Sequence, residues 1–211
     1  MKNLIIISII FSLTTTAGLA QADSTLCLEG ELKEYTVINE AQHSFARSLT
    51  IKVNESCYVR SIGDGAIKLN VTLEELLQGF ESGTDILNKG IRPPDLTLRA
   101  LKSSDLQASI EKILIERNTS DPRDLTINDI PYRSAFHQSG GQILLPQVNT
   151  TFRVRCSVMK SGITYCRLTA FISGSDIQYN LSLGNVEHPE QIDWMALYNA
   201  IERFLEHAIV N

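Results

Sequence analysis

The sequence predicts an α+β fold built on antiparallel β-sheet and stapled by disulfide bonds. Three observations lead to this class. Apolar and polar residues alternate with a period of two through most of 151–183, an apolar stripe at helical spacing follows near the C-terminus, and the chain has four cysteines behind an export signal. We therefore expect a C-terminal β-meander packed by a long C-terminal helix, with two shorter helices in the middle of the chain.

Residues 1–22 are typical of a signal peptide that is cleaved on export. Lys2 precedes an apolar run at 4–13, which is too short for a membrane span of about 20 residues. Ala20-Gln21-Ala22 then supplies the small-x-small pattern that a signal peptidase cuts. The mature protein, 23–211, is expected in the bacterial periplasm or secreted, and no segment of it is apolar enough to span a membrane.

The net charge of the chain indicates which kinds of partner it is suited to bind. The chain has 19 Lys and Arg residues against 24 Asp and Glu, a formal net charge of −5 at pH 7. An acidic protein without a basic run is poorly suited to nucleic acid or an anionic membrane. The sequence contains no glycine-rich phosphate loop and no metal-binding pair of histidines, so it predicts neither a cofactor nor a metal. A protein partner is expected instead.

The sequence of the meander predicts how its strands align and which two cysteines form one of the disulfides. Polar and apolar residues alternate from Thr151 to Val158, and Lys160-Ser161-Gly162 is suited to a three-residue hairpin loop. This loop places Cys156 directly opposite Cys166, at a separation that a disulfide accepts. A second turn at 173–176 continues the meander, which the long helix should cover.

That helix is predicted from about Glu190 to Ile209. Residues spaced three and four apart give it one apolar face, which the meander is expected to bury. The apolar face consists of Trp194, Leu197, Tyr198, Ile201, Phe204, Leu205 and Ala208.

The N-terminal half predicts more strands and the second disulfide. Cys57 is expected to pair with Cys27 and fix the mature N-terminus to this sheet. Capping boxes at Thr72 and Ser104 open the two shorter helices, with an extended Pro-Pro connection between them. The predicted strands are 33–38, 48–53, 56–62, 66–71 and, nearer the meander, 142–145.

The domain organisation allows two arrangements. The mature chain is either a single α+β domain, 23–211, or two packed lobes, 23–117 and 142–211. In both, 118–141 is expected to be mostly a polar loop, because it is rich in charged and turn-forming residues.

One hypothesis for chemistry lies in this loop. His137 precedes Ser139 and a pair of glycines, and Ser134 lies three residues earlier. A small secreted hydrolase would use His137 as the base for one of these serines. The nucleophile elbow GxSxG is absent, so the sequence favours a protein without catalytic activity.

A second hypothesis concerns the polar face of the meander. The register that pairs the cysteines also places Arg155 opposite Arg167, with Arg153 two residues along the same strand. Like charges directly opposite each other destabilise a sheet. Either an acidic group such as Asp176 or Glu187 offsets them, or the three arginines bind a carboxylate, a phosphate or an acidic partner.

These observations favour an exported binding protein, such as an inhibitor or immunity-type protein that acts on another protein. The secreted hydrolase and an accessory subunit of envelope or secretion-system assembly are the alternatives.

Overall fold

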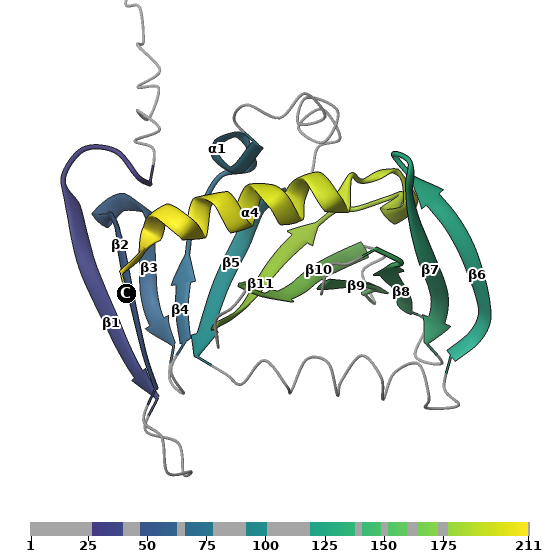
Figure 1. The fold of residues 1–211 in the computed structure, drawn as a ribbon, viewed down its shortest axis with the longest axis horizontal. Helices are drawn as coiled ribbons and strands as arrows, with labels where there is room; N and C mark the ends of the chain where they lie inside the picture. The colour runs from purple at the N-terminus through teal and green to yellow at the C-terminus, as the bar shows by residue number, and fades with distance from the viewer. Residues whose placement is uncertain are drawn as a thin grey trace, which may run out of the picture.

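The computed structural model describes residues 27–39, 47–62, 66–77, 92–100, 119–137, 141–148, 152–159, 164–172 and 177–210. Within these ranges the protein is mostly antiparallel β-sheet with few helices (Figure 1). The predicted signal peptide, the helix expected from Ser104 and the turns at 160–162 and 173–176 lie outside the described residues.

Two sheets form the framework. In the larger sheet the strand order is β3-β4-β5-β11-β10-β9-β8-β7-β6, and in the smaller it is β1-β2-β12. The larger sheet consists of β3 (Tyr58–Ile62), β4 (Ala66–Leu69), β5 (Arg92–Ala100), β6 (Thr119–Ile127), β7 (Ile130–His137), β8 (Gly141–Pro146), β9 (Phe152–Val158), β10 (Thr164–Phe171) and β11 (Ile177–Gly184). The smaller sheet consists of β1 (Leu32–Asn39), β2 (Arg47–Asn54) and β12 (Ile209–Val210).

The main helix, α4 (Trp194–Ala208), lies across one face of the larger sheet (Figure 1). It begins later than predicted, because the 3₁₀ turn η2 (Pro189–Gln191) takes up the first residues. Asp193 caps the helix by accepting a 2.8 Å hydrogen bond from the Ala196 amide. The indole Nε1 of Trp194 donates to the Pro189 carbonyl oxygen at 2.7 Å, so η2 and α4 are fixed to each other.

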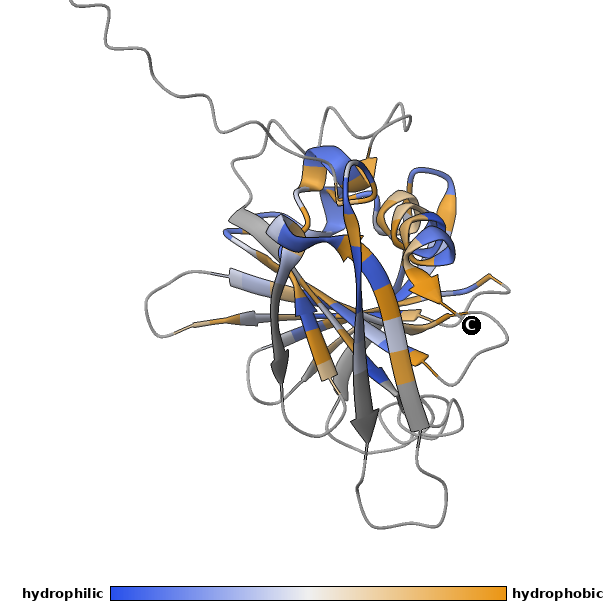
Figure 2. Ribbon diagram, turned by 90° about the vertical axis from the view of Figure 1, so that its left-hand side faces the viewer, coloured by the Kyte–Doolittle hydropathy of each residue, from blue (hydrophilic) through white to orange (hydrophobic). Residues whose placement is uncertain are grey.

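The core lies between α4 and the sheet. Trp194, Leu197, Ile201 and Leu205 of the helix have at most 1% of their surface exposed, as the predicted apolar stripe requires. The strands bury alternate residues, and Figure 2 shows this alternation as bands of hydrophilic blue and hydrophobic orange. The sheet residues facing the helix include Val154, Cys156, Cys166, Leu168, Ala170, Tyr179, Leu181 and Leu183.

The register of the meander is the predicted one. Cys156 lies opposite Cys166 and Val154 opposite Leu168 in the β9–β10 pair. Leu168 also lies opposite Leu181, so the β10–β11 pair has the predicted alignment as well. Strands β9, β10 and β11 therefore all bury the face that the sequence predicted to be apolar.

Strand β5 is a correction to the sequence analysis. The residues around Pro93 and Pro94 were expected to form a connection, but 92–100 pairs with β11 on one side and β4 on the other. Leu96 and Leu98 are fully buried, in the alternation of a central strand. The prolines lie where the β5–β11 register shifts, a place where a missing N–H is tolerated.

Strand β5 also connects strands from the two halves of the chain. Because β5 pairs with β11, one sheet runs through both of the lobes that the sequence left open as an alternative. The smaller sheet likewise joins β2 to β12, the strand that follows α4.

The segment 118–141, predicted to be mostly loop, is a second correction. Its described part forms the hairpin β6–β7, which extends the larger sheet. Asn128 and Asp129 make the two-residue turn with φ of 46° and 62°, a left-handed conformation that these side chains tolerate. Asp124 and Arg133 lie opposite each other and form a 3.4 Å salt bridge, so the charged residues stabilise the strands they were expected to break.

Both predicted cysteine pairs are present as disulfides. Cys27–Cys57 closes 30 residues, from the segment before β1 to the 3₁₀ turn η1 (Glu55–Cys57). Cys156–Cys166 closes 10 residues across the β9–β10 hairpin.

Removal of the disulfide that closes the longer loop is expected to lower stability more. Replacing Cys27 and Cys57 with serine should lower the free energy of unfolding by about 3–4 kcal/mol, because a cross-link restricts the unfolded chain more when it closes a longer loop. The same change at Cys156 and Cys166 should cost about 2–3 kcal/mol. Urea unfolding of the two double variants measures both values, and a larger loss for the second pair would contradict this account.

Candidate binding site

The face of the meander that points away from α4 carries the three predicted arginines. Arg155 of β9 lies directly opposite Arg167 of β10. Arg153 is two residues along β9 and lies opposite Thr169. Since alternate residues of a strand share a face, all three side chains lie on the same side of the sheet. The structure thus confirms the placement that the hairpin register predicted.

These side chains line a hollow of about 480 Å³. A volume of this size is within the range of ligand-binding clefts, roughly 300–1,000 Å³. The lining residues are Arg153, Arg155, Ser157, Met159, Tyr165, Cys166, Arg167, Thr169, Asn180 and Ser182.

One end of the hollow is held by a pair of polar side chains. The Thr169 hydroxyl donates a 2.8 Å hydrogen bond to the Asn180 side-chain oxygen across the β10–β11 pair. Thr169 is only 4% exposed, so this hydrogen bond satisfies a hydroxyl that is out of contact with solvent. The bond keeps the Arg153 end of the hollow in a defined shape.

The positive charges in the hollow affect one another. Burial lowers the pKa of the Arg153 guanidinium, and the charges of Arg155 and Arg167 lower it further. The arginine stays protonated at neutral pH even so, because the ordinary pKa of a guanidinium lies far above neutral. The cluster is therefore a concentration of positive charge within an acidic protein, and a bound anion would relieve the repulsion.

Among the side chains that the structure describes, no carboxylate pairs with Arg155 or Arg167 in a salt bridge. Glu187, one of the two acidic partners considered above, is exposed and makes no such bridge. The other, Asp176, lies outside the described residues.

The proposed hydrolase residues are placed differently. Ser134 is a buried residue of β7, and its hydroxyl accepts a 3.0 Å hydrogen bond from the Gln142 side chain. His137 is the last residue of the same strand, and its side chain lies outside the described part. Ser139 also lies outside it. The described residues thus place no serine and histidine in one cleft.

One of the glycines after Ser139 has a packing role. Gly141 begins β8, and a Cβ there would lie 2.6 Å from the Cys156 carbonyl oxygen of β9. Any other residue would push the two strands apart. The glycine is explained by the close approach of β8 to β9 and requires no catalytic turn.

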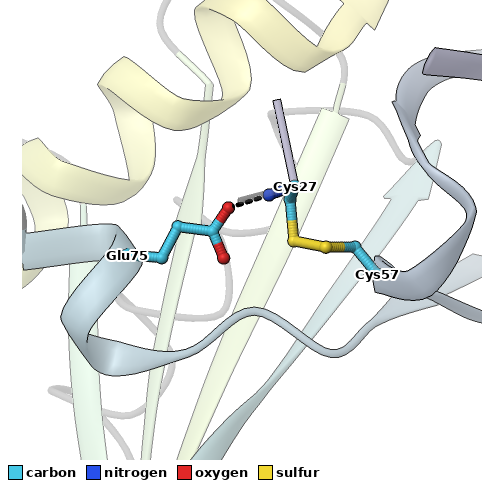
Figure 3. A group of neighbouring side chains, drawn as sticks. All are labelled: Cys27, Cys57 and Glu75. Carbon is cyan, nitrogen blue, oxygen red and sulfur yellow. Dashed lines mark hydrogen bonds between the residues drawn. A yellow bond between two sulfur atoms is a disulfide. The ribbon is translucent and has the colours of Figure 1, made fainter. Parts of the chain in front are cut away.

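A second cluster has the residue types of a metal site. Cys27, Cys57 and Glu75 offer ligand-type atoms within 4.8 Å of one another (Figure 3). Both sulfurs are joined in a disulfide and so provide no thiolate for a metal. The Glu75 carboxylate accepts a hydrogen bond from the backbone N–H of Cys27. This cluster ties the N-terminal segment to α1 (Leu73–Leu77).

Helix α1 itself is capped as predicted. The Thr72 hydroxyl accepts a 3.1 Å hydrogen bond from the Glu75 amide, the first half of a capping box. The carboxylate of Glu75 interacts with the Thr72 backbone N–H, as such a box requires, and it also accepts a hydrogen bond from Cys27. The cluster was missed in the sequence because it depends on contacts between residues almost fifty positions apart.

Comparison with known proteins does not identify a relative. No protein-family profile matches the chain, and no curated protein matches it. Among solved structures, the Ran-binding protein Mog1p of Saccharomyces cerevisiae aligns over 84% of this chain and 93% of its own, with 12% identity and a TM-score of 0.27. A TM-score this low does not establish a shared fold. Within the described residues, no helix is long and apolar enough to cross a membrane.

The Glu75 contact predicts a specific dependence of stability on pH. Partial burial raises the pKa of Glu75 above its ordinary value of 4.5, and the backbone N–H groups of Cys27 and Thr72 oppose part of that rise. A raised pKa means that the folded state holds this proton more tightly than the unfolded state. The contribution of Glu75 to stability is therefore greatest below pH 4.5 and is lost as the pH rises through the folded-state pKa.

Glu75→Gln should remove that loss, because an amide oxygen still accepts from Cys27 without a buried charge. We expect the variant to gain stability relative to wild type as the pH rises from about 4 to 7. Urea unfolding across this range measures the difference. Glu74→Gln, on the exposed side of α1, is the matched control. Parallel profiles for wild type and Glu75→Gln would contradict the assignment.

Proposed function

We propose that this chain is an exported, non-enzymatic binding protein that captures an acidic protein partner on the face formed by Arg153, Arg155 and Arg167. Inhibitors and immunity-type proteins of the bacterial envelope act in this way. One observation carries the proposal: the β9–β10 register gathers three guanidinium groups into one hollow. Guanidinium groups bind carboxylates through paired hydrogen bonds, so an acidic surface of another protein is their natural complement.

The energetics of the sheet support a binding role. Arg155 and Arg167 place two positive charges directly opposite each other, which lowers the stability of the sheet. Threonine or glutamine at either position would suit an exposed strand without that cost. A feature that weakens the free protein but would be relieved by an anion is typical of a binding site.

Export is supported by the leader and by the cysteines. Residues 1–22 have the pattern of a cleaved signal peptide, and all four cysteines of the chain are paired. Disulfides form and persist outside the cytoplasm. The periplasm or the secreted fraction is therefore the compartment we propose.

The binding role predicts opposite effects on capture and on stability. Replacing Arg155 and Arg167 with alanine should abolish capture of the acidic partner from an envelope extract and binding to a polyglutamate probe. Stability should stay unchanged or rise by a few tenths of a kcal/mol, because the like-charge pair is gone. Affinity capture and thermal unfolding of the same preparations measure both.

Arg99→Ala is the matched control, because Arg99 is an exposed arginine of β5 that does not line the hollow. It should bind like wild type. Retained capture by the double variant, or equal losses in the double variant and the control, would refute this binding face.

The export proposal has its own measurement. Mass spectrometry of the protein recovered from the periplasm or medium should show a chain that begins at Asp23. Replacing Ala20 and Ala22 with leucine should leave the leader attached, because the peptidase requires small residues there. Recovery of uncleaved wild-type protein in the cytoplasm would count against export.

A further inference from the structure

The hollow is chemically uneven along its length. Arg155 and Arg167 form one cross-strand row, and Ser157 and Tyr165 form the next row toward the β9–β10 turn. Met159 follows at the same end. Tyr165 is 39% exposed and Met159 is 51% exposed, so both side chains are accessible to a ligand beside the charges. Tyrosine and methionine are residue types enriched in binding surfaces.

The spacing of these rows matches an extended peptide. Residues two apart on a strand are separated by about 6.6–6.8 Å, which is the distance from the guanidinium row to the Tyr165 row. In an extended ligand, side chains two apart share a face and have the same separation. A peptide lying along β10 can therefore place one side chain on each row.

Recognition at this place must depend on side chains. Strand β9 is already paired with β8 and β10, and β10 with β9 and β11. A ligand above them finds no open strand edge, so it cannot add a strand to the sheet. Charge and apolar contact select the ligand instead.

We propose that the hollow binds an extended peptide segment of the partner in which an Asp or Glu and a large apolar residue lie two positions apart. The carboxylate lies between Arg155 and Arg167, and the apolar side chain lies on Tyr165 and Met159. This inference rests on the proposed function and adds to it the sequence pattern of the ligand. It gives the binding face a selectivity that charge alone does not provide.

Short synthetic peptides test the pattern with the whole protein. The probe is a fluorescently labelled seven-residue serine peptide with glutamate at the third position and phenylalanine at the fifth. Three companions change one feature each: glutamine for glutamate, serine for phenylalanine, or phenylalanine moved next to glutamate. Fluorescence anisotropy gives the dissociation constants.

The probe should bind about tenfold or more tightly than the glutamine peptide, because charge-assisted hydrogen bonds are lost without the carboxylate. It should bind about fivefold more tightly than the serine peptide and the adjacent-spacing peptide, because both lose the apolar contact. Raising the salt concentration should weaken the preference for glutamate.

Variants assign each preference to its row. Arg155→Ala with Arg167→Ala should remove the preference for glutamate over glutamine. Tyr165→Ser should remove the preference for phenylalanine and retain the preference for glutamate. Arg99→Ala should retain both, and circular dichroism should show that every variant is folded.

The outcomes separate this inference from the proposed function. Three results would overturn the sequence pattern alone. The first is equal binding of the peptides with the two spacings, and the second is an unchanged preference for phenylalanine in Tyr165→Ser. The third is that no peptide binds although polyglutamate binding still depends on the arginines. Binding of acidic ligands that is insensitive to the arginine substitutions would overturn both.

Discussion

The antiparallel pairing of β9 with β10 is the constraint on which the rest of the structure depends. Side chains alternate across a strand, so the register that places Cys156 against Cys166 under α4 also places Arg155 against Arg167 on the other face. A shift of one residue would turn the arginines into the core and the cysteines into solvent. The disulfide prevents that shift, because only one alignment brings the two sulfurs together. The core and the candidate binding face are therefore fixed by the same pairing.

The parts of the fold that the sequence predicted correctly are those set by short-range geometry. The ten-residue cysteine spacing and the alternation of apolar residues agree with the observed β9–β10 alignment, and the spacing of apolar residues marks the buried face of α4. The two errors have different causes. Strand β5 is recognisable only once β11 and β4 lie beside it, and its prolines obscure the alternation around Leu96 and Leu98. The β6–β7 hairpin was predicted as a loop because the segment is rich in polar residues. The Asn128-Asp129 turn and the alternation of apolar and polar residues on either side of it were nevertheless present in the sequence.

The candidate site was predictable to a similar extent. The register alone placed the three arginines together, since it needed only the alternation and the turn. Their hollow, the Thr169–Asn180 hydrogen bond and the exposed Tyr165 depend on how β11 and the hairpin end are packed, which no local pattern records. The serine and histidine hypothesis came from proximity in sequence. Residues three apart in an extended strand are about 10 Å apart along the chain. The His137 side chain and Ser139 lie outside the described residues, so this hypothesis stays a prediction.

The pairing of β12 with β2 has a consequence for the order of folding. Ile209 and Val210 lie against Ile51 and Thr50, and β5 must find β11 across nearly eighty residues. Neither sheet is complete until almost the whole chain is free to pair, so such a topology acquires its native contacts late and slowly. The pairs β5–β11 and β12–β2 are therefore expected to form after the hairpins between strands that are neighbours in sequence.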